Sequence, residues 1–209
     1  MLNSEVFERF RSRVSRNILL LSPIFAETEA PAGELDPVLA ALFDARAQKL
    51  AVVYSSGRNS LNGMDVYGFP FVAKLLPELV VRGFHVLFRD PPGAYSTEEL
   101  DPLKTGAITH YTKSVDFRAL LSRTDVYLRP TSTDGNSVAV LEALASGVPV
   151  LASDAVPRPD GVTLYRYGSA SEFLSCLDAL FGRLNSDRRI AAKASLSSAK
   201  DYVEFVKSL

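Results

Sequence analysis

Two carboxylates in one short stretch are the residues of this sequence best suited to chemistry. Asp134 and Glu142 are separated by seven residues, and Glu142 is the only charge in the apolar stretch Val138–Ala145. A charged side chain in an apolar stretch needs either solvent or a partner, because burying it alone is costly. A purely structural acid is uncommon in such a place, so Glu142 is a candidate ligand-binding residue.

A predicted helix start lies between the two acids. Residues 137–146 are rich in Leu and Ala, which favour a helix. The backbone N–H groups near Gly135, Asn136 and Ser137 would lack intrahelical acceptors, and the helix dipole adds partial positive charge there. Phosphate is the usual anion at such an end. A plainer interpretation is that Asp134 or Ser137 caps the helix, and capping is compatible with anion binding.

The rest of the sequence predicts the elements that position these residues. Strands and helices alternate from residue 49 onward, which predicts an α/β, Rossmann-like, doubly wound and mainly parallel sheet flanked by helices. Strands are expected at residues 17–22, 49–54, 84–88, 107–110, 126–128, 148–151 and, at an edge, 163–165. Helices are expected at residues 4–16, 37–47, 69–82 (kinked or divided by Pro77), 114–122, 137–146, 169–181 and 186–206.

The stretch from residue 124 to residue 154 resembles the nucleotide-sugar-binding signature of retaining glycosyltransferases with the GT-B fold, in the large fourth family of these enzymes. That signature has an acid, seven residues, a glutamate, an Ala-rich turn and then Gly-x-Pro-Val. Asp134, Glu142 and residues 147–150 match it in spacing and context. The resemblance implies that Glu142 hydrogen-bonds the ribose hydroxyls and that Asp134 lies near the donor sugar. The diphosphate would be held by backbone N–H groups of Gly135, Asn136, Ser137 and Val138.

The loop after the strand of residues 49–54 is expected to add a second part of the site. Ligands bind at the carboxyl ends of parallel strands, and Gly57 and Arg58 follow one of these ends. A guanidinium can clamp a diphosphate with two parallel hydrogen bonds, although most loop arginines are simply solvated. The resemblance implies a Gly-Arg pair here and a lysine a few residues on, where this chain has Asn62. Alternative sources of that second cation are Arg89, Lys104 and Lys113.

Catalytic roles are therefore predicted for Arg58, Asp134 and Glu142. Tyr111 follows a predicted strand, where it could flank the nucleobase. Thr131 follows another, where its hydroxyl could bind ribose or phosphate. Both are at least as well explained as loop residues that shape their turns. Arg158 and Asp160 lie beyond the next strand end, where an acceptor or donor sugar could reach, and neither is given a role. The resemblance extends to the segment of residues 155–159, which some family members share.

Composition excludes several classes of function. The net charge is −1 over 209 residues, with no basic tract, so no nucleic-acid partner is expected. Two histidines and one cysteine cannot make a typical zinc site, so no metal and no cofactor are expected, and the nucleotide diphosphate sugar enters as substrate. No apolar run has the length of a transmembrane segment. The single cysteine fits a reducing compartment, which favours a cytoplasmic protein, peripheral to a membrane only through a missing half.

The resemblance covers about residues 49–181, which correspond to the donor-binding half of a GT-B fold. Residues 1–48 are expected to form an N-terminal helix, strand and linker packed on the domain of residues 49–209. These 48 residues are too few for the acceptor-binding N-terminal domain, which is expected in cis or in trans. The chain is then an excised fragment, a subunit or a degenerate binding domain.

The expected function is that of a donor-binding domain in a retaining glycosyltransferase of the hexosyltransferase type. Such an enzyme transfers a sugar from a nucleotide diphosphate sugar to an acceptor such as a growing polysaccharide or glycolipid, in polysaccharide biosynthesis. Alone, the chain is expected to bind nucleotide and to transfer sugar poorly or not at all. The alternative is a non-catalytic nucleotide-sugar or partner-binding module, which Asn62 slightly favours. Half of a sugar-nucleotide epimerase is less favoured, because such enzymes need further acids and histidines.

Overall fold

The computed structural model describes residues 33–45, 47–55, 57, 60–61, 64–95, 108–134 and 137–184. The helices predicted at residues 4–16 and 186–206 and the strand predicted at residues 17–22 therefore lie outside the described residues. So do several residues of the predicted site, namely Arg58, Asn62, Lys104, Gly135 and Asn136.

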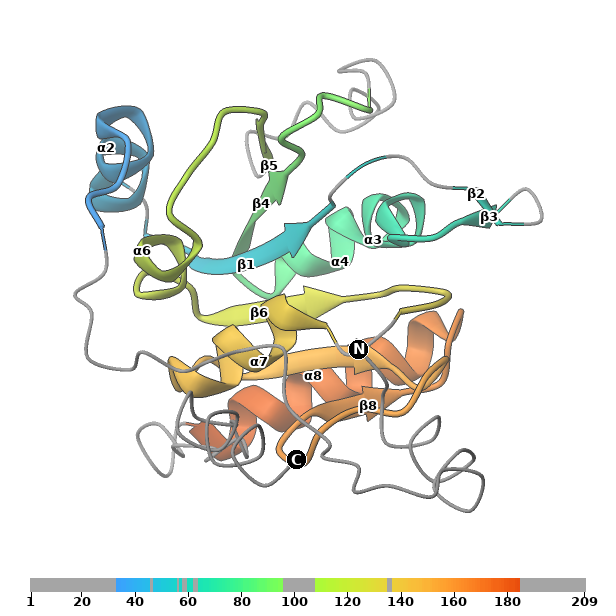
Figure 1. The fold of residues 1–209 in the computed structure, drawn as a ribbon. Helices are drawn as coiled ribbons and strands as arrows, with labels where there is room; N and C mark the ends of the chain where they lie inside the picture. Colours follow the sequence, from blue (N-terminus) through green and yellow to red (C-terminus); the bar gives the residue numbers. More distant parts are fainter. Residues whose placement is uncertain are drawn as a thin grey trace, which may run out of the picture.

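Six parallel strands form the centre of the fold (Figure 1). They are β1 (Lys49–Tyr54), β4 (Phe84–Arg89), β5 (Ile108–Tyr111), β6 (Val126–Arg129), β7 (Val150–Ser153) and β8 (Thr163–Tyr165). Their order is β5-β4-β1-β6-β7-β8, so the chain builds outward from β1 on one side and then returns to build outward from β6 on the other. The predicted parallel sheet is confirmed, with β8 at the edge. The point between β1 and β6, where the strand order reverses, is where ligands bind in such sheets.

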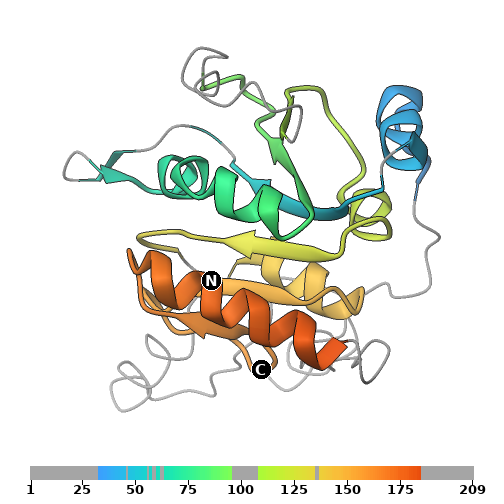
Figure 2. The ribbon, with the colours of Figure 1, turned by 180° about the vertical axis from the view of Figure 1, so that it is seen from behind.

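Helices cover both faces of the sheet (Figures 1 and 2). One face carries α3 (Phe69–Lys74), α4 (Leu76–Val81) and α8 (Ala170–Leu184), and the other carries α2 (Pro37–Ala45), α6 (Phe117–Leu121) and α7 (Val138–Ala145). Side chains of β1 alternate between the two clusters, with Ala51 and Val53 in the first and Leu50 and Val52 in the second. Burial on both faces explains why the strands are apolar throughout rather than alternating.

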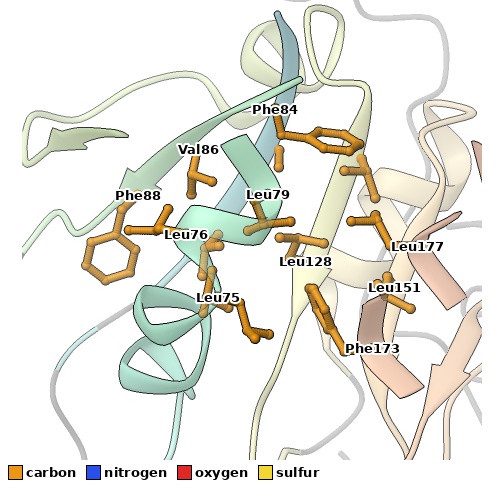
Figure 3. Close-up of a cluster of buried hydrophobic side chains, with 14 of the residues drawn as sticks. Leu75, Leu76, Leu79, Phe84, Val86, Phe88, Leu128, Leu151, Phe173 and Leu177 are labelled. Carbon is orange, nitrogen blue, oxygen red and sulfur yellow. The ribbon is translucent and has the colours of Figure 1, made fainter. Parts of the chain in front are cut away.

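The cluster beneath α3, α4 and α8 fixes the strands in place. Leu79 of α4 and Phe173 of α8 approach Leu128 of β6 from two sides (Figure 3), and all three are fully buried. Phe69 stacks on Phe88 with ring centroids 3.6 Å apart. Side chains packed this closely resist displacement, so the carboxyl ends of the strands stand on a rigid base.

A proline divides the predicted helix of residues 69–82. Leu75 has non-helical dihedrals (φ −95°, ψ 1°) between α3 and α4, and Pro77 lies in the first turn of α4. Proline is tolerated there because its missing N–H needs no partner in a first turn. The predicted division is therefore confirmed. The short hairpin of β2 (Ser60–Leu61) and β3 (Met64–Asp65) was not predicted, because strands of two residues carry no readable alternation.

The amino-terminal edge of the sheet is closed by the chain's own hydrogen bonds. The Asp125 carboxylate accepts from the Leu50 N–H at 2.6 Å, and the Asp125 N–H donates to the Leu50 carbonyl at 2.9 Å. The Lys49 N–H donates to the Gly83 carbonyl at 2.9 Å. These hydrogen bonds hold the amino-terminal ends of the strands together, whereas the carboxyl-terminal ends of the strands carry the candidate site.

Among the described residues, no helix is long and apolar enough to cross a membrane.

Candidate functional site

The carboxyl ends of the central strands bring several predicted site residues to one edge of the sheet. Because the strands are parallel, the ends of β1, β5 and β6 all lie at this edge (Figure 1). Gly57 follows β1, Tyr111 ends β5, and Thr131 follows β6. The loop after β6 leads to Ser137 and the start of α7. This edge adjoins the switch point, where the fold is expected to bind a ligand.

The start of α7 is not capped by either side chain that the sequence offered for that role. Ser137 occupies the N-cap position with extended backbone (φ −64°, ψ 110°), yet its hydroxyl makes no capping hydrogen bond. Its carbonyl accepts from the N–H groups of Val140 and Leu141, at 3.1 and 3.2 Å. The N–H groups of Val138 and Ala139 meet no acceptor among the described residues. These uncapped N–H groups can receive an anion.

The start of α6, unlike that of α7, is capped by a side chain. Asp116 is its N-cap, and the carboxylate accepts from the N–H groups of Arg118 and Ala119 at 2.9 and 3.1 Å. A neighbouring helix of the same layer is therefore capped by its own acid, while α7 is not.

Glu142 lies in the second turn of α7 and is half-buried. Its carboxylate makes no hydrogen bond or ion pair with any described residue. Burial raises the pKa of Glu142, the positive charge of Arg118 opposes this shift, and the negative charge of Asp116 adds to it. An unpaired carboxylate in a partly dry position is a strong acceptor for hydroxyl donors, such as the two of a ribose.

Asp134, in contrast, is held by two arginines. Its Oδ2 atom lies 2.9 Å from Nε of Arg129 and 2.9 Å from Nη1 of Arg158. Burial alone would raise the pKa of Asp134, but the hydrogen bonds and charges of the two guanidinium groups outweigh it and lower the pKa. We call these three residues the arginine–aspartate cluster. The cluster keeps the Asp134 carboxylate ionised and fixes its direction.

Thr131 and Tyr111 are turned into the protein. Thr131 is fully buried, and its hydroxyl accepts from Nη2 of Arg158 at 2.7 Å while its carbonyl accepts from the Ser153 hydroxyl at 2.5 Å. Tyr111 is buried in the core cluster beneath α2 and α6. Burial raises the pKa of its hydroxyl, and the negative charge of Asp36 adds to the shift. Both side chains are therefore buried, and their contacts with a nucleotide stay predictions.

The loop after β1 begins with a local anchor. The hydroxyl of the fully buried Ser55 donates to the Gly57 carbonyl at 2.8 Å and accepts from the Gly57 N–H at 3.1 Å. This pair of bonds fixes the backbone of Gly57 against the end of β1.

The alternative cations of the sequence analysis differ in their surroundings. The Arg89 guanidinium lies over the rings of Tyr54 and Phe117, 4.6 and 5.7 Å from their centroids. Its Nη2 atom is 3.4 Å from the Val115 carbonyl. Lys113 is exposed on the loop after β5. Arg89 is therefore held against an aromatic pair, while Lys113 has solvent around it.

Sequence reasoning gave no role to Arg129 and Arg158. Arg129 had a usable signal, because it ends the apolar run of β6 directly before Pro130, and a charge at the carboxyl end of a central strand faces the ligand edge. The contact of Arg158 with Asp134 was not predicted, because it spans 24 residues and depends on how β7 is placed. Among the described residues, no group of three or more His, Cys, Asp or Glu side chains could hold a metal ion.

Comparisons with solved structures support the fold. A sucrose-phosphate synthase from Thermosynechococcus elongatus matches with a TM-score of 0.61 and 15% identity, over 100% of this chain and 53% of that one. Anabaena HepE in complex with UDP-glucose matches with a TM-score of 0.59 and 14% identity, over 82% of this chain and 52% of that one. Our chain thus spans about half the length of these two proteins.

A third structure is itself a single domain. The C-terminal domain of a glycosyl transferase group 1 family protein from Francisella tularensis matches with a TM-score of 0.55 and 13% identity, over 90% of this chain and 98% of that one. Identities this low support a shared fold alone. No curated protein matches the sequence.

The family assignment rests on the sequence itself. Residues 66–182, more than half of the chain, match the family model described as glycosyl transferases group 1. This segment includes the loop after β6, the whole of α7 and both acids, Asp134 and Glu142. The chain therefore belongs to the glycosyl transferases group 1 family and has the Rossmann-like architecture of a C-terminal GT-B half.

Proposed function

We propose that this chain is the donor-binding domain of a retaining glycosyltransferase that takes a nucleoside diphosphate sugar as its donor. Glu142 accepts hydrogen bonds from the ribose hydroxyls, and the uncapped N–H groups at the start of α7 receive the diphosphate. Gly57 and Arg58 approach the diphosphate from the loop after β1. The proposal extends to a hexosyl donor and to an acceptor in polysaccharide or glycolipid synthesis, on the cytoplasmic side of a membrane.

One observation carries the proposal. A half-buried carboxylate without a partner among the described residues stands on the same short helix whose first N–H groups lack acceptors. An acceptor for hydroxyls and a set of donors for an anion are thus spaced along one helix at the switch point of the sheet. A nucleotide offers the complementary pair, a diol and a phosphate. The UDP-glucose bound to HepE, a protein of the same fold, supports this choice.

In the proposed reaction, this chain holds the sugar donor and a second domain holds the acceptor. The bond between the anomeric carbon and the diphosphate oxygen breaks, and its electron pair stays on the diphosphate. An acceptor hydroxyl bonds to the same face of that carbon and gives its proton to the departing diphosphate beside it. The N–H groups of α7 and the Arg58 guanidinium offset the negative charge that grows on the leaving diphosphate. The acceptor is held by a second domain, in cis or in trans.

Calorimetric titration with UDP, GDP and ADP tests the proposal, on the native chain and on Glu142→Gln. We expect one nucleotide to bind, and the variant to lose roughly tenfold or more in affinity, because hydrogen bonds to a charged acceptor carry about 1.5–3 kcal/mol each. Asp178→Asn is the matched control, since it also removes one carboxylate, from a side chain on α8 that is 56% exposed. No binding of any nucleotide to the folded native chain would refute the proposed function.

A second candidate is a non-catalytic binding module, and the arginine–aspartate cluster favours it. A carboxylate held between two guanidinium groups has little basicity and little freedom to act on a sugar. Incubating the chain with the sugar form of the nucleotide that binds, and following release of free sugar, separates the two. A transferase half releases sugar slowly to water, whereas a module gives only the rate measured without protein.

A further inference from the structure

The arginine–aspartate cluster holds more positive than negative charge in a nearly dry place. The side chains of Arg129 and Arg158 are 8% and 2% exposed, and that of Asp134 is 12% exposed. Two guanidinium groups face one carboxylate, and no further acid pairs with either arginine among the described residues. Because a buried charge without a counter-charge is costly, the excess positive charge of this cluster favours the binding of an anion.

The two arginines differ in how much hydrogen-bonding capacity they keep. Arg158 engages all three of its nitrogens, with Asp134 at 2.9 Å, the Thr131 hydroxyl at 2.7 Å and the Ser153 carbonyl at 3.4 Å. Arg129 donates from Nε to Asp134 at 2.9 Å, and its Nη1 has one long contact of 3.4 Å with the Tyr54 carbonyl. A guanidinium has five N–H donors. Arg158 uses three of these donors and Arg129 two, one of them in a long contact, so Arg129 keeps more donors for a ligand than Arg158 does.

Arg129 also stands where the parts of the proposed donor site meet. It is the last residue of β6, and its contact with the Tyr54 carbonyl brings it to the end of β1, where the Gly57 loop begins. The Asp134 that it orients is three positions before Ser137, the N-cap of α7. The Tyr67 ring lies 5.3 Å from the guanidinium and helps to hold it in place. Arg129 thus lies at the same end of the sheet as the first N–H groups of α7.

We propose that Arg129 donates hydrogen bonds to the terminal phosphate group of the nucleoside diphosphate, while Arg158 positions the cluster through Asp134 and Thr131. This inference rests on the proposed function and names a contact within the same site. It gives Asp134 a definite task, because the carboxylate that is shared by both arginines holds Arg129 in the direction of the phosphate.

The test compares a nucleoside diphosphate with its monophosphate, using the base that binds the native chain. Arg129→Met and Arg158→Met are matched variants, since each removes one positive charge and leaves Asp134 paired with the other arginine. We expect Arg129→Met to weaken diphosphate binding roughly tenfold or more and to leave monophosphate binding within about twofold. Arg158→Met lowers the melting temperature but keeps the ratio of the two affinities within about twofold of the native ratio.

Three other outcomes would overturn the inference. Equal losses for diphosphate and monophosphate in Arg129→Met would mean a general disturbance of the site, and unchanged binding of both would mean no contact. An equal change of the ratio in Arg158→Met would mean a long-range charge effect. Arg129→Lys, which keeps the charge, recovers part of the diphosphate affinity and shows that the position tolerates substitution. Absence of nucleotide binding to the native chain would refute the proposed function as well. The three outcomes above refute only the inference about Arg129, so the two failures can be told apart.

Discussion

At Asp134, two guanidinium groups meet a single carboxylate oxygen, and this changes what the residue can do. The spacing to Glu142 marks both as site acids, yet their surroundings have opposite effects. The pKa of Asp134 is lowered by its arginine partners against the effect of burial, while that of Glu142 is raised by burial. Asp134 is thus paired within the protein, whereas Glu142 has no partner among the described residues, which is why we propose Glu142 as the acceptor for a ligand. Spacing along the sequence identifies both acids but does not separate these roles.

Replacing Asp134 by Asn is expected to destabilise the fold by about 3–5 kcal/mol, because it leaves two buried guanidinium groups without their shared anion. The exposed Asp160→Asn makes the same change of charge and is expected to stay within about 0.5 kcal/mol of the native free energy of unfolding. Denaturant melts of both variants at neutral pH measure the difference. Equal stability of the two variants would mean that the cluster contributes nothing to the fold.

The same residue predicts a dependence on acid. The folded pKa of Asp134 lies below the ordinary value of 3.8, so its contribution is complete above pH 3.8 and is lost as the pH falls through the lower folded value. The gap in stability between the native chain and Asp134→Asn should therefore narrow only below about pH 4.

At the scale of elements, the turn that follows β3 packs against the loop that follows β6 and carries Asp134. Gly68, the N-cap of α3, has φ 69° and packs against Pro130, the residue after Arg129. The Asp65 carboxylate accepts from the N–H groups of Tyr67 and Gly68, both at 2.9 Å. The Ser132 N–H also donates to the Val66 carbonyl at 2.9 Å. Two segments distant in sequence are therefore locked together beside the proposed phosphate site.

Gly68→Ala is expected to cost about 1–3 kcal/mol or more of folding free energy, since a side chain at positive φ is strained. Its Cβ would also lie 2.0 Å from the Pro130 carbonyl oxygen, so the loop after β6 must shift. Nucleotide affinity should fall together with stability. Gly83→Ala is the control, because Gly83 also has positive φ (76°) but open space around its Cβ. A loss of stability equal in both variants, with affinity unchanged, would show that the contact with Pro130 is unimportant.

The elements themselves were largely readable from the sequence. β1 and β8 have the predicted bounds, because apolar runs that end in turn residues mark buried strands. Helix ends were less accurate, and α6 covers five residues of a predicted nine, since Asp116 begins the helix later than Ser114 would. The arginine–aspartate cluster was not readable, because each of its contacts joins side chains that only the packed sheet brings together.

At the scale of the whole molecule, the proposed donor site should couple nucleotide binding to the stability of the fold. A ligand that binds only the folded state stabilises it, by about 2.7 kcal/mol at a concentration one hundred times its dissociation constant. For a chain of this length we expect the melting temperature to rise by about 5–10 °C with the nucleotide that binds. Differential scanning calorimetry measures the rise. At the same concentration Glu142→Gln should show a much smaller one, and an equal rise would place the nucleotide away from Glu142.

The closed amino-terminal edge of the sheet has an evolutionary consequence. Hydrogen bonds such as those between Asp125 and Leu50 help to hold the strands in register at this end of the sheet. Substitutions in the loops at the carboxyl end that spare the arginine–aspartate cluster and the contact of Gly68 with Pro130 should therefore leave the framework of the sheet intact. We expect a lineage that carries this scaffold to be able to change its ligand by altering those loops, while inheriting its strand register unchanged.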